Sequence, residues 1–221
     1  MKFANRYDAG QQLALQLQHL RNHQPVVLAL PRGGVPVAAV VAEALNAPLD
    51  VIVVRKIGAP LQSELAIGAV TDGGRPSYVL NDDVVRTLGI DERFLEQAVQ
   101  REHAEVCRRQ ALYRSGRAPI EVGDRTAIVV DDGIATGATV RAALRSLRER
   151  SPQRLVLAVP VGPQEVAQEL RRDVDELVWL HSPERFGAVG QFYSDFAQVS
   201  DDEVIRVLDE AVKRVESGAG R

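Results

Sequence analysis

Short apolar runs alternate with longer mixed stretches along most of this chain, and this rhythm predicts its fold. Runs of strand length separated by segments of helical length are typical of βαβ units. Strands buried on both faces appear as continuous apolar runs, as they do here. We therefore predict an α/β fold with a five-stranded parallel Rossmann-like sheet flanked by helices. The five predicted strands are Pro25–Leu30, Leu49–Val54, Thr126–Val130, Arg154–Val159 and Glu176–Leu180.

The rhythm breaks between the second and third of these strands. Glu64–Val70 and Ser77–Leu80 predict a hairpin around Asp72–Gly74, because glycine adopts the positive φ angles that tight turns need. A short helix, Asp82–Leu88, and a long helix from Asp91 to about Arg114 follow. The chain therefore carries an insertion within its α/β core.

Composition narrows the function classes. The 221 residues have a formal net charge of −3, so no general basic field suggests nucleic acid or an anionic membrane as a partner. The single cysteine, Cys107, cannot form an intrachain disulfide and fits a reducing compartment. The first residues show no signal-peptide pattern, and no apolar run approaches the length of a membrane span. We expect a cytoplasmic protein.

The groups best suited to bind a ligand follow the predicted strand Thr126–Val130. Asp131 and Asp132 follow this strand directly, and their carboxylates can accept hydrogen bonds from a diol. The loop after them contains Gly137, and a helix begins close to it. The first N–H groups of a helix lack intrahelical partners and lie at the positive end of the helix dipole, so they favour an anion. The turn therefore suits a phosphate attached to a ribose.

Two other strand ends carry basic residues. Arg32, Gly33 and Gly34 follow the first strand; the glycines let an anion approach the backbone and the arginine supplies charge. Arg55 and Lys56 follow the second strand. Neighbouring side chains of a strand point to opposite faces, so only one of these two cations can face a ligand directly, and the sequence does not say which.

The segment Ile128–Thr139 resembles the phosphoribosyl-pyrophosphate (PRPP) signature of the type I phosphoribosyltransferases, with two acidic residues and then Thr-Gly-x-Thr. Nearly the whole chain is also similar to stand-alone phosphoribosyltransferase-like proteins without an assigned substrate. This resemblance implies that the loop around Arg32, often with a non-proline cis peptide, holds pyrophosphate. It implies catalytic roles for Asp131, Asp132, Arg32 and Lys56, a 5′-phosphate site at Ala135, Thr136, Gly137, Ala138 and Thr139, and a pyrophosphate site at Arg32, Gly33, Gly34, Arg55 and Lys56.

The resemblance also implies Mg²⁺, bound through PRPP, with Asp131 and Asp132 as further candidate ligands. In the family a small lobe, the hood, stacks on the acceptor; Phe186 and Tyr193 are our candidates for that contact. The stretch Gly58–Gly68 matches the position of a mobile catalytic loop, with Ser63 and Glu64 as candidates. We divide the single domain, residues 1–221, into a core (about 25–56 and 125–181), an insertion (about 57–124) and a hood (the N-terminal segment and 182–215).

We interpret the chain as a phosphoribosyltransferase that moves phosphoribose from PRPP to a nitrogenous acceptor, for which a nucleobase is our first choice. Ala135 occupies the place where enzymes for 6-oxopurines carry an aspartate, which argues against hypoxanthine or guanine. One alternative is a PRPP- or nucleotide-sensing regulator without turnover. Another is a phosphatase or phosphotransferase that uses Asp131 covalently. A homodimeric assembly is left open.

Overall fold

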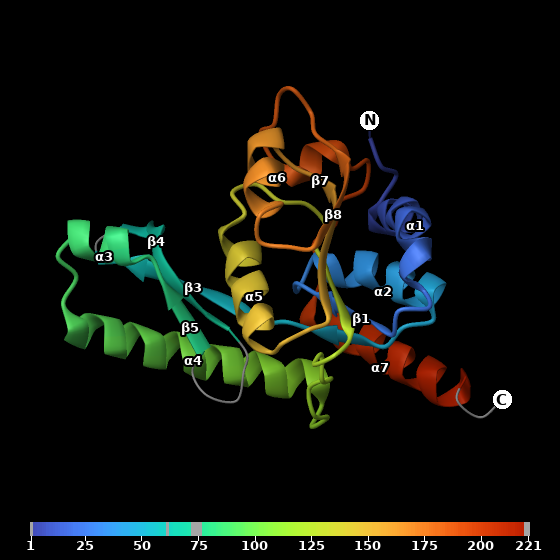
Figure 1. Cartoon of the computed structure of the whole chain (residues 1–221), viewed down its shortest axis with the longest axis horizontal. Coiled ribbons are helices and arrows are strands. Elements are labelled where there is room, and N and C mark those ends of the chain that lie inside the picture. The colour runs from blue at the N-terminus through green and yellow to red at the C-terminus, as the bar shows by residue number, and fades with distance from the viewer. Residues whose placement is uncertain (1, 61, 72–76, 219–221) are drawn as a thin grey trace.

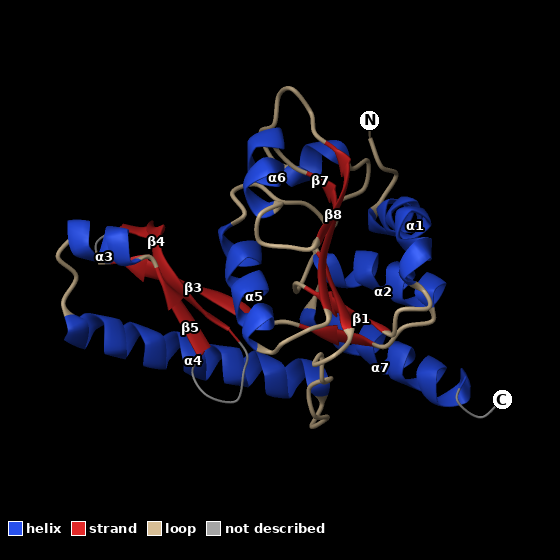
Figure 2. Cartoon of the chain, viewed as in Figure 1, coloured by secondary structure: helices blue, strands red, loops and turns tan. Residues whose placement is uncertain are grey.

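A computed structural model describes residues 2–60, 62–71 and 77–218, and it contains the predicted parallel sheet. The sheet has five strands in the order β2-β1-β6-β7-β8, and each neighbouring pair is parallel. Figures 1 and 2 show helices packed around this sheet. The five-stranded parallel sheet predicted from the apolar rhythm is therefore confirmed. Its elements are β1 (Pro25–Ala29), α2 (Gly34–Leu45), β2 (Leu49–Val51), β6 (Thr126–Val130), α5 (Ala138–Glu149), β7 (Arg154–Val161), α6 (Gln164–Leu170) and β8 (Glu176–His181).

Alternate side chains of the central strand β6 enter two different hydrophobic clusters. Ile128 and Val130 belong to one cluster, which also contains residues of α1 (Arg6–Leu17), α2 and α7 (Asp201–Gly218). Ala127 and Val129 belong to the other, together with residues of α5. Because successive side chains of a strand point to opposite faces, both faces of the sheet are covered by helices. This double covering explains why the strands read as continuous apolar runs.

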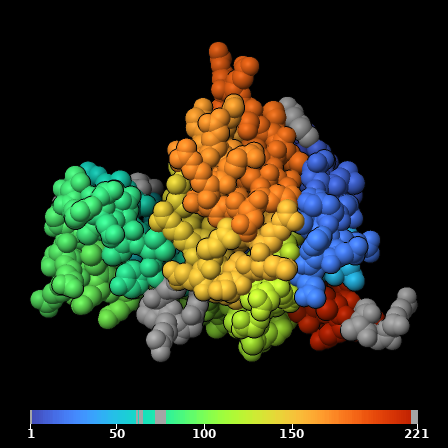
Figure 3. All heavy atoms as spheres, viewed as in Figure 1, coloured from blue at the N-terminus to red at the C-terminus, as the bar shows by residue number. Residues whose placement is uncertain are grey.

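The insertion contains a second sheet, which differs from the prediction. We expected one strand over Leu49–Val54, but β2 ends at Val51 and a new strand begins at Val54. This strand starts a three-stranded antiparallel sheet, whereas a two-stranded hairpin was predicted; the predicted turn at Asp72–Gly74 lies outside the described residues. We call residues 54–114 the arm, which forms a separate lobe in Figure 3. Its elements are β3 (Val54–Ala59), β4 (Gln62–Thr71), β5 (Ser77–Leu80), α3 (Asp82–Thr87) and α4 (Glu92–Arg114).

A buried ion pair joins the end of the arm to the edge of the core. Arg114, the last residue of α4, donates from Nε to Asp50 of β2 over 2.9 Å and from Nη2 to the carbonyl oxygen of Val51 over 2.9 Å. Asp50 also accepts a hydrogen bond from the backbone N–H of Ile120. The buried charges are thus paired and hydrogen-bonded, as buried charges must be. The chain returns from the arm beside the strand from which it left.

The N-terminal segment packs against the irregular segment that follows β8. The backbone N–H of Phe3 donates to Phe192, the last residue of the 3₁₀ helix η2 (Val189–Phe192), over 2.8 Å. The N–H of Ser194 donates to Phe3 over 2.8 Å. Another 3₁₀ turn, η1 (Gln18–Leu20), follows α1 directly. No helix in the described parts of the chain combines the length and apolar character needed to span a membrane.

Candidate functional site

The loops after β1 and β6 meet because these two strands are neighbours. Ala29 pairs with Val130 in the parallel register, and the N–H of Leu30 donates to the carbonyl oxygen of Val130 over 3.0 Å. Both strands therefore end at the same level. In open parallel sheets, ligands bind beyond the carboxyl ends of the strands. The two loops that the sequence selected form neighbouring parts of one site.

Glycine permits the close contact between these loops. A Cβ atom added to Gly33 would lie 2.0 Å from Oδ2 of Asp132, and one added to Gly34 would lie 2.7 Å from the carbonyl oxygen of Val130. Neither distance is compatible with a side chain of any kind. The peptide bond between Pro31 and Arg32 is cis, the feature that the resemblance implied for this loop. The first loop therefore lies directly against the acidic pair.

The two carboxyl groups of the site occupy a sheltered environment. Burial, followed by the neighbouring Asp132, raises the pKa of Asp131 well above its ordinary value. Burial also raises the pKa of Asp132, while the guanidinium of Arg6 acts in the opposite direction. Arg6 contacts Asp132 Oδ2 through both Nε and Nη2, each over 2.8 Å. Desolvation therefore outweighs the guanidinium of Arg6 in setting the pKa of this pair.

The predicted phosphate loop leaves a row of N–H groups open. Gly137 has a φ of 77°, a conformation that favours glycine, and α5 begins at the next residue. The structure describes no residue that accepts a hydrogen bond from the backbone N–H of any residue from 135 to 139. Unsatisfied N–H groups at the start of a twelve-residue helix favour a bound anion. The geometry fits the 5′-phosphate site expected from the sequence.

The two adjacent cations of the arm lie in different environments. Because β2 ends early, Arg55 and Lys56 belong to β3 of the arm, not to the parallel sheet. Arg55 forms an ion pair with Glu102 of α4 over 3.1 Å. Lys56 lines a groove of about 590 Å³ that also contains Thr136 and Thr139 of the phosphate loop. The structure thus brings Lys56, and not Arg55, to the phosphate loop.

This groove lies between the arm and α5. The stretch Gly58–Gly68, which matches the position of a mobile catalytic loop, contains the end of β3 and most of β4. The backbones of Ser63 and Glu64 lie in β4. Antiparallel pairing with β3 extends through this stretch, with register shifts on both sides of Gly58. Cationic side chains from three elements line the groove, namely Lys56, Arg86, Arg141 and Arg145.

The two aromatic candidates differ in accessibility. Tyr193 is only 3% exposed, and its ring lies 4.9 Å from the ring of Phe196, centroid to centroid. Its hydroxyl donates to the carbonyl oxygen of Asp132 over 2.5 Å. Tyr193 therefore supports the acidic loop and presents no ring face on which an acceptor could stack. Phe186 is partly exposed and stacks on Phe192 at 5.5 Å.

Sequence reasoning gave Arg6 no role in the site. Arg6 lies in the first turn of α1, yet its guanidinium contacts the carboxylate of Asp132, far along the chain. It also donates to the carbonyl oxygen of Ala197 over 2.7 Å and lies 3.9 Å from the centroid of the Phe196 ring. No local spacing connects these residues.

Comparisons with known proteins agree with this geometry. The family model described as "Phosphoribosyl transferase domain" matches residues 3–196. A curated Mycobacterium tuberculosis (strain CDC 1551 / Oshkosh) protein named "Putative phosphoribosyl transferase" is 49% identical over 209 residues. That match covers 95% of this chain and 47% of the relative, so the chain spans about half the length of the curated relatives it matches.

A solved structure shows the same fold over nearly the whole chain. The crystal structure of TT1426 from Thermus thermophilus superposes with a TM-score of 0.84 at 42% sequence identity. The match covers 95% of this chain and 99% of that one. Fold, site geometry and family model lead to the same conclusion. The chain belongs to the phosphoribosyl transferase family.

Proposed function

We propose that this protein transfers 5-phosphoribose from PRPP to a nitrogenous acceptor, with a nucleobase as the first choice, and releases pyrophosphate. One observation carries the proposal: the Arg32–Gly34 loop lies against Asp131 and Asp132, and the open N–H groups of the loop from Ala135 to Thr139 follow in the same turn. Three neighbouring subsites thus match the three parts of PRPP. Pyrophosphate, ribose and 5′-phosphate would each meet groups of suitable chemistry.

Each group has a distinct task in this proposal. The reaction breaks the bond between the anomeric carbon and pyrophosphate, so positive charge develops on the sugar and negative charge on the leaving group. Arg32 and the neighbouring backbone stabilise the leaving group, and Lys56 contributes a second cation from the arm. Asp131 and Asp132 accept hydrogen bonds from ribose hydroxyls and offset the positive charge of the ring. The N–H groups at α5 hold the 5′-phosphate.

The acidic residues fit a magnesium ion that arrives with PRPP. Among the described residues, no group of three or more His, Cys, Asp or Glu side chains could hold a metal, and one oxygen of Asp132 is held by Arg6. Magnesium commonly binds through one or two carboxylates, waters and substrate phosphates. Asp131 or Asp132 would supply such a carboxylate. When bound, the ion neutralises charge on the pyrophosphate.

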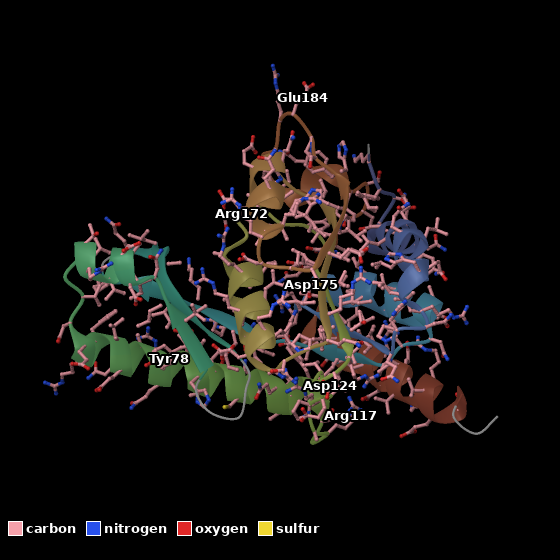
Figure 4. The ribbon with its side chains drawn as sticks, viewed as in Figure 1. Tyr78, Arg117, Asp124, Arg172, Asp175 and Glu184 are labelled. Atoms are coloured by element: carbon pink, nitrogen blue, oxygen red, sulfur yellow. The ribbon has the colours of Figure 1, made fainter. Side chains whose placement is uncertain are left out.

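The acceptor would be covered by the segment after β8. Phe186 lies in this segment, and Figure 4 shows Glu184 at the tip of its loop, pointing away from the sheet. Ala135 carries no carboxylate toward a base, so a 6-oxopurine lacks the partner that enzymes for such bases provide. We propose Phe186 as the stacking residue for the acceptor. Measuring acceptor affinity in Phe186→Ala tests this assignment.

One experiment tests the reaction. The protein is incubated with PRPP, Mg²⁺ and single acceptors from a panel of purines, pyrimidines and small amines, and pyrophosphate release is followed. We expect release with one acceptor class and loss of PRPP affinity when EDTA removes the metal. Tight PRPP binding without release would favour the sensing role. No PRPP binding at all would exclude both.

Asp132→Asn tests the proposed ribose contact, because the amide keeps the shape of the side chain and removes its charge. We expect a weaker affinity for PRPP in a variant that still folds, with a lower melting temperature because the sheltered ion pair with Arg6 is lost. An unchanged affinity would show that the ribose binds elsewhere.

A further inference from the structure

Arg6 holds the Asp132 carboxylate in one orientation. Its Nε and Nη2 atoms both contact Oδ2, each over 2.8 Å, while its Nη1 atom donates to the carbonyl oxygen of Ala197 over 2.7 Å. The guanidinium also packs on the ring of Phe196. Both side chains of the ion pair are only 12% exposed. A planar guanidinium with three such contacts keeps little rotational freedom, so the carboxylate that it holds is fixed as well.

The two oxygens of this carboxylate are used differently. Oδ2 accepts a hydrogen bond from Nε of Arg6 and forms an ion-pair contact with its Nη2. Oδ1 accepts no hydrogen bond from any part of the chain that the structure describes. The backbone of the same residue is held as well, because its carbonyl oxygen accepts the hydroxyl of Tyr193. Oδ1 is therefore the oxygen that remains for a ligand hydroxyl.

We propose that Arg6 is a positioning residue of the ribose site, which orients Asp132 so that Oδ1 accepts a hydroxyl of a ribose 5-phosphate ligand. This inference rests on the proposed function, in which the acidic pair binds the ribose. Arg6 contacts no reacting atom and acts through Asp132. The free torsion of an aspartate side chain is broad, so without Arg6 the carboxylate samples other orientations.

A purely structural role for Arg6 would change the ligand affinities in a different pattern. Arg6 joins α1 to Ala197 and Phe196, so its loss could weaken this packing without a specific effect on the ribose. A structural role would affect every ligand of the site to a similar extent. A positioning role affects ligands with ribose hydroxyls and spares ligands without them.

The experiment compares three probes in one set of variants. Affinities for PRPP, ribose 5-phosphate and pyrophosphate, each with Mg²⁺, are measured by calorimetry for the unchanged protein, Arg6→Ala and Arg6→Lys. We expect Arg6→Ala to lose about tenfold or more in affinity for the two ribose ligands, the size expected for a charged hydrogen bond. Its pyrophosphate affinity stays within about twofold. Lysine keeps the charge and lacks the forked geometry, so Arg6→Lys should show an intermediate loss.

Two controls make the outcome decisive. Arg117→Ala removes another arginine ion pair, with Asp209 at 2.6 Å, and should leave all three affinities unchanged. Figure 4 shows Arg117 at the opposite end of the view from Glu184. In an Asp132→Asn background, Arg6→Ala should cost little further affinity, because both changes act on one contact. Thermal melting identifies a variant that does not fold, and the Lys variant then carries the test.

Specific results would overturn the inference. It fails if Arg6→Ala binds ribose 5-phosphate as the unchanged protein does, if it loses pyrophosphate affinity equally, or if its loss is undiminished in Asp132→Asn. If the unchanged protein binds pyrophosphate and neither ribose ligand, the proposed function fails, and the role of Arg6 fails with it.

Discussion

Gly33 lies directly against the carboxylate of Asp132, so that the loop after β1 and the loop after β6 share one narrow contact. A Cβ atom at position 33 would lie 2.0 Å from Oδ2 of Asp132. This contact joins the proposed pyrophosphate and ribose subsites, and no larger residue can replace the glycine unless the Asp132 carboxylate or one of the loops moves.

Gly33→Ala should therefore impair ligand binding. We expect at least a tenfold loss of PRPP affinity and a destabilisation of about 1–3 kcal/mol, because overpacked sites force such shifts. Gly123→Ala is the matched control: its new methyl group would meet only the carbonyl oxygen of Arg150 at 3.8 Å, an ordinary contact. Calorimetric titration with PRPP and thermal melting measure both effects. Equal affinities of the two variants would contradict the assignment of the loop.

The two adjacent cations of the arm should differ in function. Lys56→Gln should weaken PRPP binding several-fold, because Lys56 lines the groove beside Thr139. Arg55→Gln should leave PRPP affinity unchanged and lower stability by less than about 1 kcal/mol, since its ion pair with Glu102 is partly exposed. Titration with PRPP and thermal melting of both variants measure these effects. A stronger effect of Arg55→Gln on binding would reverse the assignment.

Tyr193→Phe should destabilise the acidic loop. The change removes the hydroxyl that donates to the carbonyl oxygen of Asp132 and leaves that buried oxygen without its partner. The expected cost is about 1–3 kcal/mol. For a chain of this length that is a fall of about 2–4 °C in melting temperature per kcal/mol. Tyr7→Phe is the control, because Tyr7 is 57% exposed. A melting temperature equal to that of the control would contradict this supporting role.

The raised pKa of Tyr113 predicts that the protein loses stability at alkaline pH. Burial, with a hydrogen bond to Asp201, raises its pKa from 10.0 to about 12. The folded state thus favours the protonated phenol, and the stability that this provides is complete below pH 10 and is lost as the pH rises toward 12. Across that interval, the melting temperature of the unchanged protein should fall more than the melting temperature of Tyr113→Phe. A constant difference between the two proteins from about pH 8 to about pH 11.5 would refute the shift.

Local patterns predicted the parallel sheet and marked the loops of the candidate site, for a physical reason. The apolar run Thr126–Val130 encodes a strand buried on both faces, and the acidic pair and glycines after it encode a ligand loop within one short stretch. Because β1 and β6 are paired neighbours in the sheet, Arg32–Gly34 lies at the same end of the sheet as this loop. The strand and its loop need no knowledge of distant contacts, whereas the pairing of β1 with β6 joins segments far apart in the chain.

Features that depend on distant contacts were not predictable. Apolar residues continue from Val51 through Val54, so the sequence shows no break where the chain leaves one sheet for another. That break depends on pairing between β3 and β4, and it decides the environments of Arg55 and Lys56. The contact between Arg6 and Asp132 likewise depends on the docking of α1.

The order of strands in the sheet has a consequence for the kinetics of folding. β1 pairs with β6, so the whole arm lies in the loop that this pairing closes, whereas β3, β4 and β5 pair with their neighbours along the chain. The entropy of loop closure grows only logarithmically with loop length, so the arm adds little thermodynamic cost. Pairings distant in sequence nevertheless form slowly, and local hairpins form fast. We therefore expect the site between β1 and β6 to assemble after the hairpins of the arm.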